Sequence, residues 1–155
     1  MIDIQIPGRG VYHLSHLVLD VNGTITLEGR LIDGVVERVQ ALRDVVEVHC
    51  LTANTRGQQD AIDASLGISA VRIRAGGEAA QKEAFVRELG GGVCAVGNGA
   101  IDAGMLRQAA LGIAVVGEEG LATEALQAAD LVVPHVNAAL DLLLDPLRLV
   151  ATLRR

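Results

Sequence analysis

Small polar and acidic residues follow three apolar runs of the sequence, and their types suit phosphate and metal chemistry. HLVLD ends in Asp20 and leads into Asn22, VVEVHCL leads into Thr52, and GVCAV leads into Asn98 and then Asp102. Carboxylate and amide oxygens bind hard cations such as Mg²⁺, and a carboxylate can also act as a nucleophile. Glycines beside these residues allow the backbone to approach an anion closely.

The elements around these residues alternate between short β-rich runs and segments with helical periodicity. Strands are expected over 2–6, 16–20, 45–51, 70–74, 92–96, 111–116 and 131–134, and helices over 34–44, 58–67, 78–90, 101–110, 121–129 and the C-terminal region. Near-continuous Val/Ile/Leu strands joined by helices are typical of a parallel sheet covered on both faces. We therefore predict an α/β fold, a Rossmann-like three-layer αβα sandwich with a mainly parallel sheet, in one domain over residues 1–155.

In such a sheet, ligands bind at the carboxyl ends of the strands, near the point where the strand order reverses. The polar residues that follow the apolar runs are therefore expected to meet at one edge of the sheet. The segments that join the predicted elements are short, so the sequence leaves no room for an inserted cap domain.

Composition narrows the classes of partner. The chain has 155 residues, a net charge of -6, one tyrosine, one phenylalanine and no tryptophan, which argues against a nucleic-acid-binding surface. Its apolar runs fall short of the ~20 residues that a membrane span requires, and its first residues do not resemble a signal peptide. We expect a cytoplasmic protein in which Cys50 and Cys94 are buried, reduced thiols.

The segments DVNGT, LT followed by small polar residues, EAAQKEAF and GNGAID occur in the order and spacing of the four motifs of the haloacid dehalogenase (HAD) superfamily. The sequence resembles the small soluble branch related to the phosphorylation domain of P-type ATPases, and the similarity extends from Leu17 to the terminal LVATLRR. The resemblance implies a β-hairpin flap after the first core strand, a Mg²⁺ cofactor, and phosphoryl transfer through an aspartyl phosphate.

The resemblance also implies a role for each matching residue. Asp20 would be the nucleophile and also a metal ligand. The implied catalytic residues are Asp20, Asn22, Thr52 and Lys82. The implied phosphate-binding residues are Gly23, Thr24, Thr52, Ala53 and Lys82. The implied metal ligands are Asp20, Asn22 through its carbonyl, Asn98 and Asp102, directly or through water.

Two positions depart from the superfamily's pattern. Its phosphatases usually carry a second aspartate two residues after the nucleophile as general acid and base, whereas this chain has Asn22. An amide cannot act as a general acid and then as a general base near neutral pH, so the ~10²- to 10⁴-fold contribution of that catalysis is expected to be absent. Asn98 stands where the family commonly has aspartate, which should weaken metal binding. We expect slow turnover, and a preference for phosphoanhydrides, acyl phosphates and activated aryl phosphates.

Each motif also has a purely structural interpretation. Asn22-Gly23 is a strong signal for a hairpin turn, Lys82 could be a solvated residue of an amphipathic helix, and Asn98 could cap a helix. Other residues are expected to have these lesser roles: Asn54 or Thr55 as helix caps, Arg56 and Arg107 as substrate contacts, and His13, His16, His49 and His135 as structural residues without metal-binding spacing.

Two classes of function remain. The first is a Mg²⁺-dependent, capless phosphohydrolase that acts on a small phosphorylated substrate. The second is a catalytically impaired HAD-fold protein that serves as a phosphate-ligand sensor or protein-binding module. Without a cap, access to Asp20 should be open, and a neighbouring subunit could cover it. Homo-oligomerisation is therefore plausible, and the apolar segment ALDLLLDPLRLVATL could supply either an interface or a core helix.

Overall fold

A six-stranded parallel sheet forms the centre of the computed structural model, which describes residues 1–53 and 57–155. The strand order is β10-β9-β8-β3-β6-β7, and the paired strands run parallel throughout. The strands are β3 (His16–Asp20), β6 (Glu47–Thr52), β7 (Val71–Arg72), β8 (Val93–Gly97), β9 (Leu111–Val115) and β10 (Leu131–Val133). The predicted α/β fold with a parallel sheet is confirmed.

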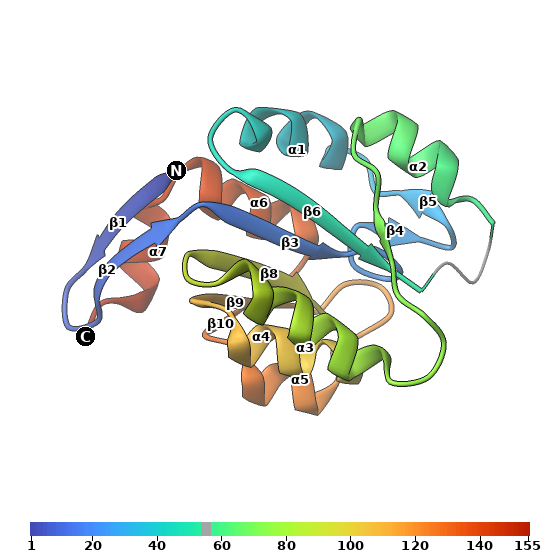
Figure 1. Ribbon diagram of the computed structural model, residues 1–155. Coiled ribbons are helices and arrows are strands. Elements are labelled where there is room, and N and C mark those ends of the chain that lie inside the picture. The colour runs from blue at the N-terminus through green and yellow to red at the C-terminus, as the bar shows by residue number, and fades with distance from the viewer. Residues whose placement is uncertain (54–56) are drawn as a thin grey trace.

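Helices cover both faces of this sheet (Figure 1). On one face lie α1 (Val35–Arg43), α2 (Gln59–Leu66) and α6 (Val136–Leu144), and on the other lie α3 (Glu78–Leu89), α4 (Ala103–Gln108) and α5 (Thr123–Ala128). Successive strand residues point to opposite faces, so Leu17 and Leu19 pack into one hydrophobic cluster and Val18 into the other. The three-layer arrangement explains why β3 is apolar without alternation.

The position of β3 fixes where a ligand should bind. In the sheet, β3 lies between β6 on one side and β8 on the other. The strand order therefore reverses between β3 and β8, and a crevice is expected outside the carboxyl ends of these strands. Asp20 is the last residue of β3 and Gly97 the last residue of β8, which places the expected site residues at this crevice.

A short antiparallel hairpin follows β3, as predicted, but its turn is not at Asn22-Gly23. The hairpin consists of β4 (Thr26–Leu27) and β5 (Arg30–Leu31), with Leu27 paired to Arg30. Its two central residues, Glu28 and Gly29, have φ angles of 52° and 80°, and positive φ at both positions matches the twist of a two-residue hairpin. Asn22-Gly23 instead lies in the loop that connects β3 to this hairpin.

The N-terminus forms a second hairpin of which the sequence predicted only the first strand. β1 (Ile2–Ile6) pairs antiparallel with β2 (Gly10–Leu14). The C-terminal helix α7 (Leu147–Leu153) packs beside β1, and the two chain ends lie near this hairpin (Figure 1). The N–H of Arg155 donates to the Pro7 carbonyl at 2.9 Å. Residues 10–14 show no strong apolar alternation, because most of their side chains are exposed.

The C-terminal region is helical, as predicted, but Pro146 divides it into α6 and α7. Proline restricts the preceding residue, and Asp145 has the non-helical φ and ψ values of -127° and 79°. Leu140 and Leu143 of α6 and Leu149 of α7 are buried in the core. This apolar segment therefore packs within the chain, and homo-oligomerisation stays a prediction.

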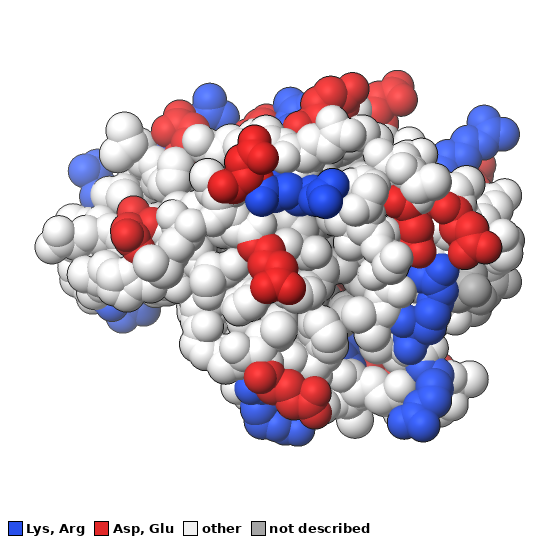
Figure 2. Space-filling model, turned by 45° about the horizontal axis from the view of Figure 1, so that its top comes forward, with Lys and Arg blue, Asp and Glu red and all other residues white. Residues whose placement is uncertain are grey.

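The strand expected over 70–74 is reduced to β7, Val71–Arg72, at the edge of the sheet. Cys50 and Cys94 are buried free thiols, and burial raises the pKa of the Cys50 thiol to about 12. Acidic and basic side chains are interspersed on the face that Figure 2 shows. Within residues 1–53 and 57–155, the helices are too short or too polar to cross a lipid bilayer.

Candidate active site

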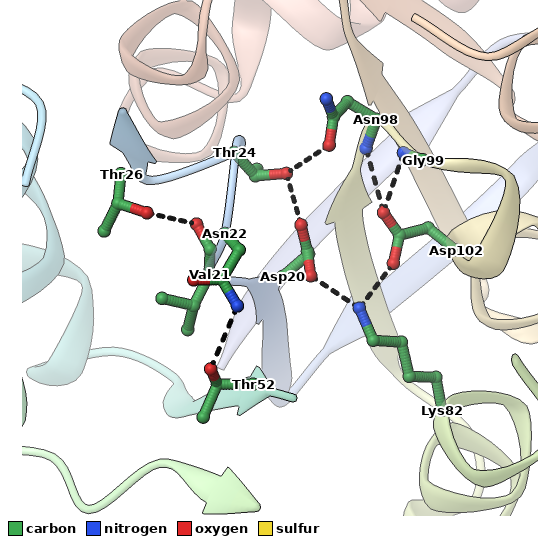
Figure 3. A network of polar contacts seen from close by, with 10 residues as sticks. All are labelled: Asp20, Val21, Asn22, Thr24, Thr26, Thr52, Lys82, Asn98, Gly99 and Asp102. Atoms are coloured by element: carbon green, nitrogen blue, oxygen red, sulfur yellow. Dashed lines mark hydrogen bonds and ion pairs between the residues drawn. The ribbon is translucent and has the colours of Figure 1, made fainter. Parts of the chain in front are cut away.

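A tight loop after β3 places a hydroxyl group against the candidate nucleophile. The Val21 carbonyl accepts hydrogen bonds from the N–H groups of Thr24, Ile25 and Thr26, and from the Thr26 hydroxyl at 3.0 Å. This winding returns the chain toward the end of the strand, so that Thr24 Oγ1 lies 2.8 Å from Asp20 Oδ2. The loop therefore holds the Asp20 carboxylate in a fixed orientation (Figure 3).

Lys82 is fully buried and lies between two carboxylates. Its Nζ donates to Asp20 Oδ1 at 2.5 Å and to Asp102 Oδ1 at 2.7 Å, and 1% of its side chain is exposed. Burial alone would lower the pKa of Lys82, but the two carboxylates outweigh that effect and raise the pKa. Lys82 is thus a charged member of the site and not a solvated residue of α3.

Asp102 organises the backbone at the end of β8. Its Oδ2 accepts from the N–H of Asn98 at 3.1 Å and from the N–H of Gly99 at 2.9 Å, while Oδ1 accepts from Lys82. A Cβ atom at Gly97 would lie 2.7 Å from the Asp102 carboxyl carbon, so the glycine makes this approach possible. Both oxygens of Asp102 are engaged by the protein, which gives it a positioning role for Lys82 and Asn98.

Asn98 directs its oxygen toward the same hydroxyl as Asp20. Asn98 Oδ1 lies 3.0 Å from Thr24 Oγ1, and its Nδ2 donates to the Gly120 carbonyl at 3.2 Å. A hydroxyl carries a single hydrogen, so Thr24 can donate to only one of the two oxygens at a time. The other oxygen keeps a lone pair for a further partner, as a metal ligand must.

The charges of the network also suit a cation. Asp20 and Asp102, when ionised, carry two negative charges against the single positive charge of Lys82. Burial and the charge of Asp102 raise the pKa of Asp20 to about 6, against the lowering effect of Lys82 and Thr24. A buried site with excess negative charge and carboxylate and amide oxygens fits a divalent metal such as Mg²⁺.

Asn22 and Thr52 form the opposite side of the site. Asn22 is exposed, and its Nδ2 donates to Thr52 Oγ1 at 3.2 Å, while Thr52 itself is buried at the end of β6. The N–H of Thr24, expected to bind phosphate, donates to the Val21 carbonyl at 3.2 Å. Thr24 therefore contacts the site through its hydroxyl group, which donates to the Asp20 carboxylate.

An open cleft of about 680 Å³ lies over this network. The expected site residues that line it are Asp20, Asn22, Ala53, Lys82, Asn98 and Asp102. Gly23 and Thr24 instead border a neighbouring cavity of about 590 Å³ beneath the flap. The structure thus brings residues from four separate segments of the sequence to one cleft.

Glu119 also lines the cleft, and the sequence reasoning missed it. A Cβ atom at Gly23 would lie 2.1 Å from Glu119 Oε2, so this carboxylate lies directly against the loop that follows Asp20. The signal was present, because Gly-Glu-Glu-Gly at 117–120 follows the apolar run of β9 in the same way that polar residues follow the other strands.

Other expected residues fall outside the cleft. Asn54, Thr55 and Arg56 lie outside the described residues. Arg107 is exposed on α4 and is not among the described residues that line the cleft. The interpretation of all four histidines as scattered is wrong for two of them, because His16 Nδ1 and His49 Nε2 lie 3.2 Å apart.

The buried Lys82 gives a test of the network by stability. Replacing Lys82 with methionine would leave two buried carboxylates without their cation, and breaking a buried ion pair in this way costs about 3–5 kcal/mol. We expect Lys82→Met to lower the free energy of unfolding by about that amount in denaturant titrations. The control is Arg87→Met on the same helix, where the lost partner is Glu83 at the surface. Equal stability of the two variants would contradict the described network.

Comparisons with known proteins give both a relative and a fold. No family model matches the chain. It is 47% identical over 62 residues to the uncharacterized protein MJ0073 of Methanocaldococcus jannaschii, a match that spans 40% of this chain and 67% of the relative. The relative's description states no activity.

Two solved structures share the architecture. One is 3-deoxy-D-manno-octulosonate 8-phosphate phosphatase from Moraxella catarrhalis, in complex with magnesium, phosphate and KDO, with a TM-score of 0.67, 18% identity, and coverage of 90% of this chain and 91% of that chain. The other is a zinc-transporting PIB-type ATPase, with a TM-score of 0.64, 23% identity, and coverage of 79% of this chain and 20% of that chain. At these identities the likeness is one of fold.

Proposed function

We propose that the chain, which belongs by its sequence to the family of MJ0073 and shares its fold with the Moraxella phosphatase and the PIB-type ATPase, is a Mg²⁺-dependent, capless phosphohydrolase of the HAD type. In this reaction Asp20 is the nucleophile, and the covalent intermediate is an aspartyl phosphate. The observation that carries it is the buried contact of Lys82 with both Asp20 and Asp102 at the floor of the cleft. A lysine is almost never fully buried unless it is paired with a carboxylate. Buried, paired titratable groups of this kind in a cleft are typical of catalytic sites.

In the first step, a carboxylate oxygen of Asp20 attacks the phosphorus atom of the substrate. A bond forms between that oxygen and phosphorus, and the bond from phosphorus to the leaving group breaks with both electrons going to the leaving group. Lys82 neutralises charge on the phosphoryl oxygens, and Thr52 donates its hydroxyl to them. Water then attacks phosphorus, releases inorganic phosphate and regenerates the Asp20 carboxylate.

Asp20, Asn98 and the Asn22 carbonyl would hold the metal. When bound, Mg²⁺ would neutralise negative charge on the phosphoryl group. Asp102, whose two oxygens are engaged, fixes Lys82 and the backbone of Asn98 and does not need to contact the metal directly. The magnesium and phosphate in the Moraxella phosphatase structure support this choice of cofactor and a small phosphorylated substrate.

Because Asn22 supplies no general acid, it limits which leaving groups can depart at a useful rate. Its amide donates a hydrogen bond to Thr52, but an amide is too weakly acidic to transfer a proton to a departing oxygen. Good substrates are therefore those whose leaving group departs as a stable anion, such as acyl phosphates, phosphoanhydrides and activated aryl phosphates. Alkyl phosphate monoesters should be slow.

The experiment that tests the proposal measures phosphate release from acetyl phosphate by the purified full chain. We expect multiple turnovers in Mg²⁺, loss of activity in EDTA, and recovery when Mg²⁺ is restored. Equal rates in EDTA and in Mg²⁺ would contradict the metal requirement. Absence of turnover for acetyl phosphate and for an activated aryl phosphate, in folded protein with Mg²⁺, would favour the phosphate-binding module instead.

Glu119 should contribute to metal affinity, because its carboxylate borders the cleft beside Gly23 and the charge of a site tunes its affinity for hard cations. We expect Glu119→Gln to raise the Mg²⁺ concentration that gives half-maximal activity several-fold. The neighbouring Glu118→Gln is the matched control, since Glu118 borders the cavity under the flap and not the cleft. If both variants behave like the wild-type protein, Glu119 has no role at the metal.

A further inference from the structure

A second cluster of metal-ligating side chains lies at the opposite end of the central strands. His16 is the first residue of β3 and Glu47 the first residue of β6, whereas Asp20 ends β3. Four residues of extended chain separate His16 from Asp20 by about 13 Å. We propose that His16, Glu47 and His49 form a binding site for Zn²⁺ or a transition metal of similar ligand preference, distinct from the Mg²⁺ site at Asp20.

The parallel register assembles the three residues. His16 pairs with Glu47 across β3 and β6, and His49 follows Glu47 by two residues. Side chains of a strand alternate between its faces, so all three project from the same face of the sheet. This is the face that α3 covers, where the Phe85 ring meets the His49 ring edge-on at a centroid distance of 5.4 Å.

The separations of the ligand atoms fit one metal ion. His16 Nδ1 and His49 Nε2 lie 3.2 Å apart, Glu47 Oε2 lies 3.6 Å from His16 Nδ1, and Glu47 Oε1 lies 3.7 Å from His49 Nε2. Two ligands at 2.0–2.1 Å from a tetrahedral zinc ion are about 3.3–3.4 Å apart. The two Glu47 distances end on different oxygens, and with one ligand atom taken from each residue the three atoms lie within 4.8 Å of one another. Rotations of the exposed Glu47 side chain would therefore bring the three residues onto a common ion.

The surroundings favour a metal over a simple hydrogen bond between two histidines. The side chains of His16 and His49 are 21% and 15% exposed, so their rings are held in place and partly desolvated. Burial lowers the pKa of His49, and metal binding requires neutral imidazole. Glu47 is mostly exposed, which leaves the cluster accessible to solvent and a fourth coordination position available to water.

The two sites differ in the metals that they should select. The proposed site at Asp20 offers oxygen ligands, which suit Mg²⁺, whereas two imidazoles and one carboxylate suit zinc, cobalt or nickel. An ion bound here would link the amino ends of β3 and β6. Because it binds the folded chain, it would raise the free energy of unfolding by an amount that grows with the logarithm of its concentration above the dissociation constant.

The test is a titration of untagged protein, treated with EDTA and then dialysed, with Zn²⁺. The buffer contains excess Mg²⁺, so that the proposed site at Asp20 is already occupied. We expect one equivalent to bind with micromolar or tighter affinity and to raise the melting temperature. His49→Gln and, separately, Glu47→Gln should weaken binding by about 10-fold or more. Glu47 is exposed, so its variant remains informative if the histidine variant does not fold. Co²⁺ in place of Zn²⁺ should give the absorption spectrum of a tetrahedral site.

His13→Gln is the matched control, since His13 is exposed and contacts Asp3 at 2.7 Å; it should bind Zn²⁺ like the wild-type protein. The proposal is overturned if the wild-type protein binds no Zn²⁺ at micromolar concentrations. It is also overturned if Asp20→Asn removes the binding while His49→Gln and Glu47→Gln retain it, because the ion would then occupy the cleft.

Discussion

Replacing Asp20 with asparagine is expected to reduce Mg²⁺-dependent phosphate release by on the order of 10³-fold or more, because an amide cannot form the covalent intermediate. The substitution is nearly isosteric and retains a group that can contact Lys82 and Thr24, which contact the carboxylate at 2.5 and 2.8 Å. The measurement is phosphate release from acetyl phosphate at saturating Mg²⁺. Asp33→Asn, an exposed position, is the control and should retain full activity.

The same variant should be no less stable than the wild-type protein in EDTA at neutral pH. The pKa of Asp20 is raised from 3.8 to about 6 in the fold, first through burial and then through Asp102. The metal-free native state thus binds this proton more tightly than the unfolded chain does, and stability falls as pH rises from about 4 to about 6. The melting temperature of Asp20→Asn relative to wild type should rise over that range.

The activity measurement decides the role of Asp20. Retained phosphate release in a folded Asp20→Asn variant would exclude Asp20 as nucleophile.

Replacing Asn22 with aspartate is expected to raise the turnover of alkyl phosphate monoesters by about 10²- to 10⁴-fold, the usual contribution of a general acid. Asn22 lines the cleft beside Asp20, so a carboxyl group there could protonate the leaving oxygen and then accept a proton from the attacking water. The gain should be much smaller for acetyl phosphate, whose leaving group needs no proton. The measurement is the ratio of kcat/KM for the two substrate classes.

Asn22→Ser is the control for this second prediction. It removes the amide that contacts Thr52 but adds no titratable group, so it should produce no gain. If Asn22→Asp is folded, binds Mg²⁺ and still shows no increase for alkyl monoesters, the absence of an acid is not what limits this protein. Equal gains in Asn22→Ser and Asn22→Asp would point to the lost contact with Thr52 instead.

The sequence predicted which strand ends meet at the cleft because the signals for those ends are local. Asp20 and Asn98 each stand at the end of, or just after, an apolar run, and parallel strands bring such ends to one edge. Lys82 could be identified only through the resemblance to the HAD motifs. Its helix pattern alone fits a solvated residue, and its burial depends on two carboxylates that are distant in the sequence.

The features that the sequence did not predict depend on non-local register. His16 and His49 become neighbours only because β3 and β6 pair with His16 opposite Glu47. Glu119 contacts the Asn22-Gly23 loop only because β9 lies next to β8. Asn22-Gly23 has the composition of a hairpin turn, but contacts of the Val21 carbonyl wind this loop differently, and the hairpin turns at Glu28.

Chemical trapping of the intermediate tests the central claim most directly. The full chain, mixed with radiolabelled acetyl phosphate and Mg²⁺ and quenched in acid within the first turnover, should carry one phosphoryl group. Peptide mass spectrometry should place it on Asp20, and hydroxylamine should release it, as expected of an acyl phosphate. Phosphate release without a labelled protein, or a label on a residue other than Asp20, would contradict the account.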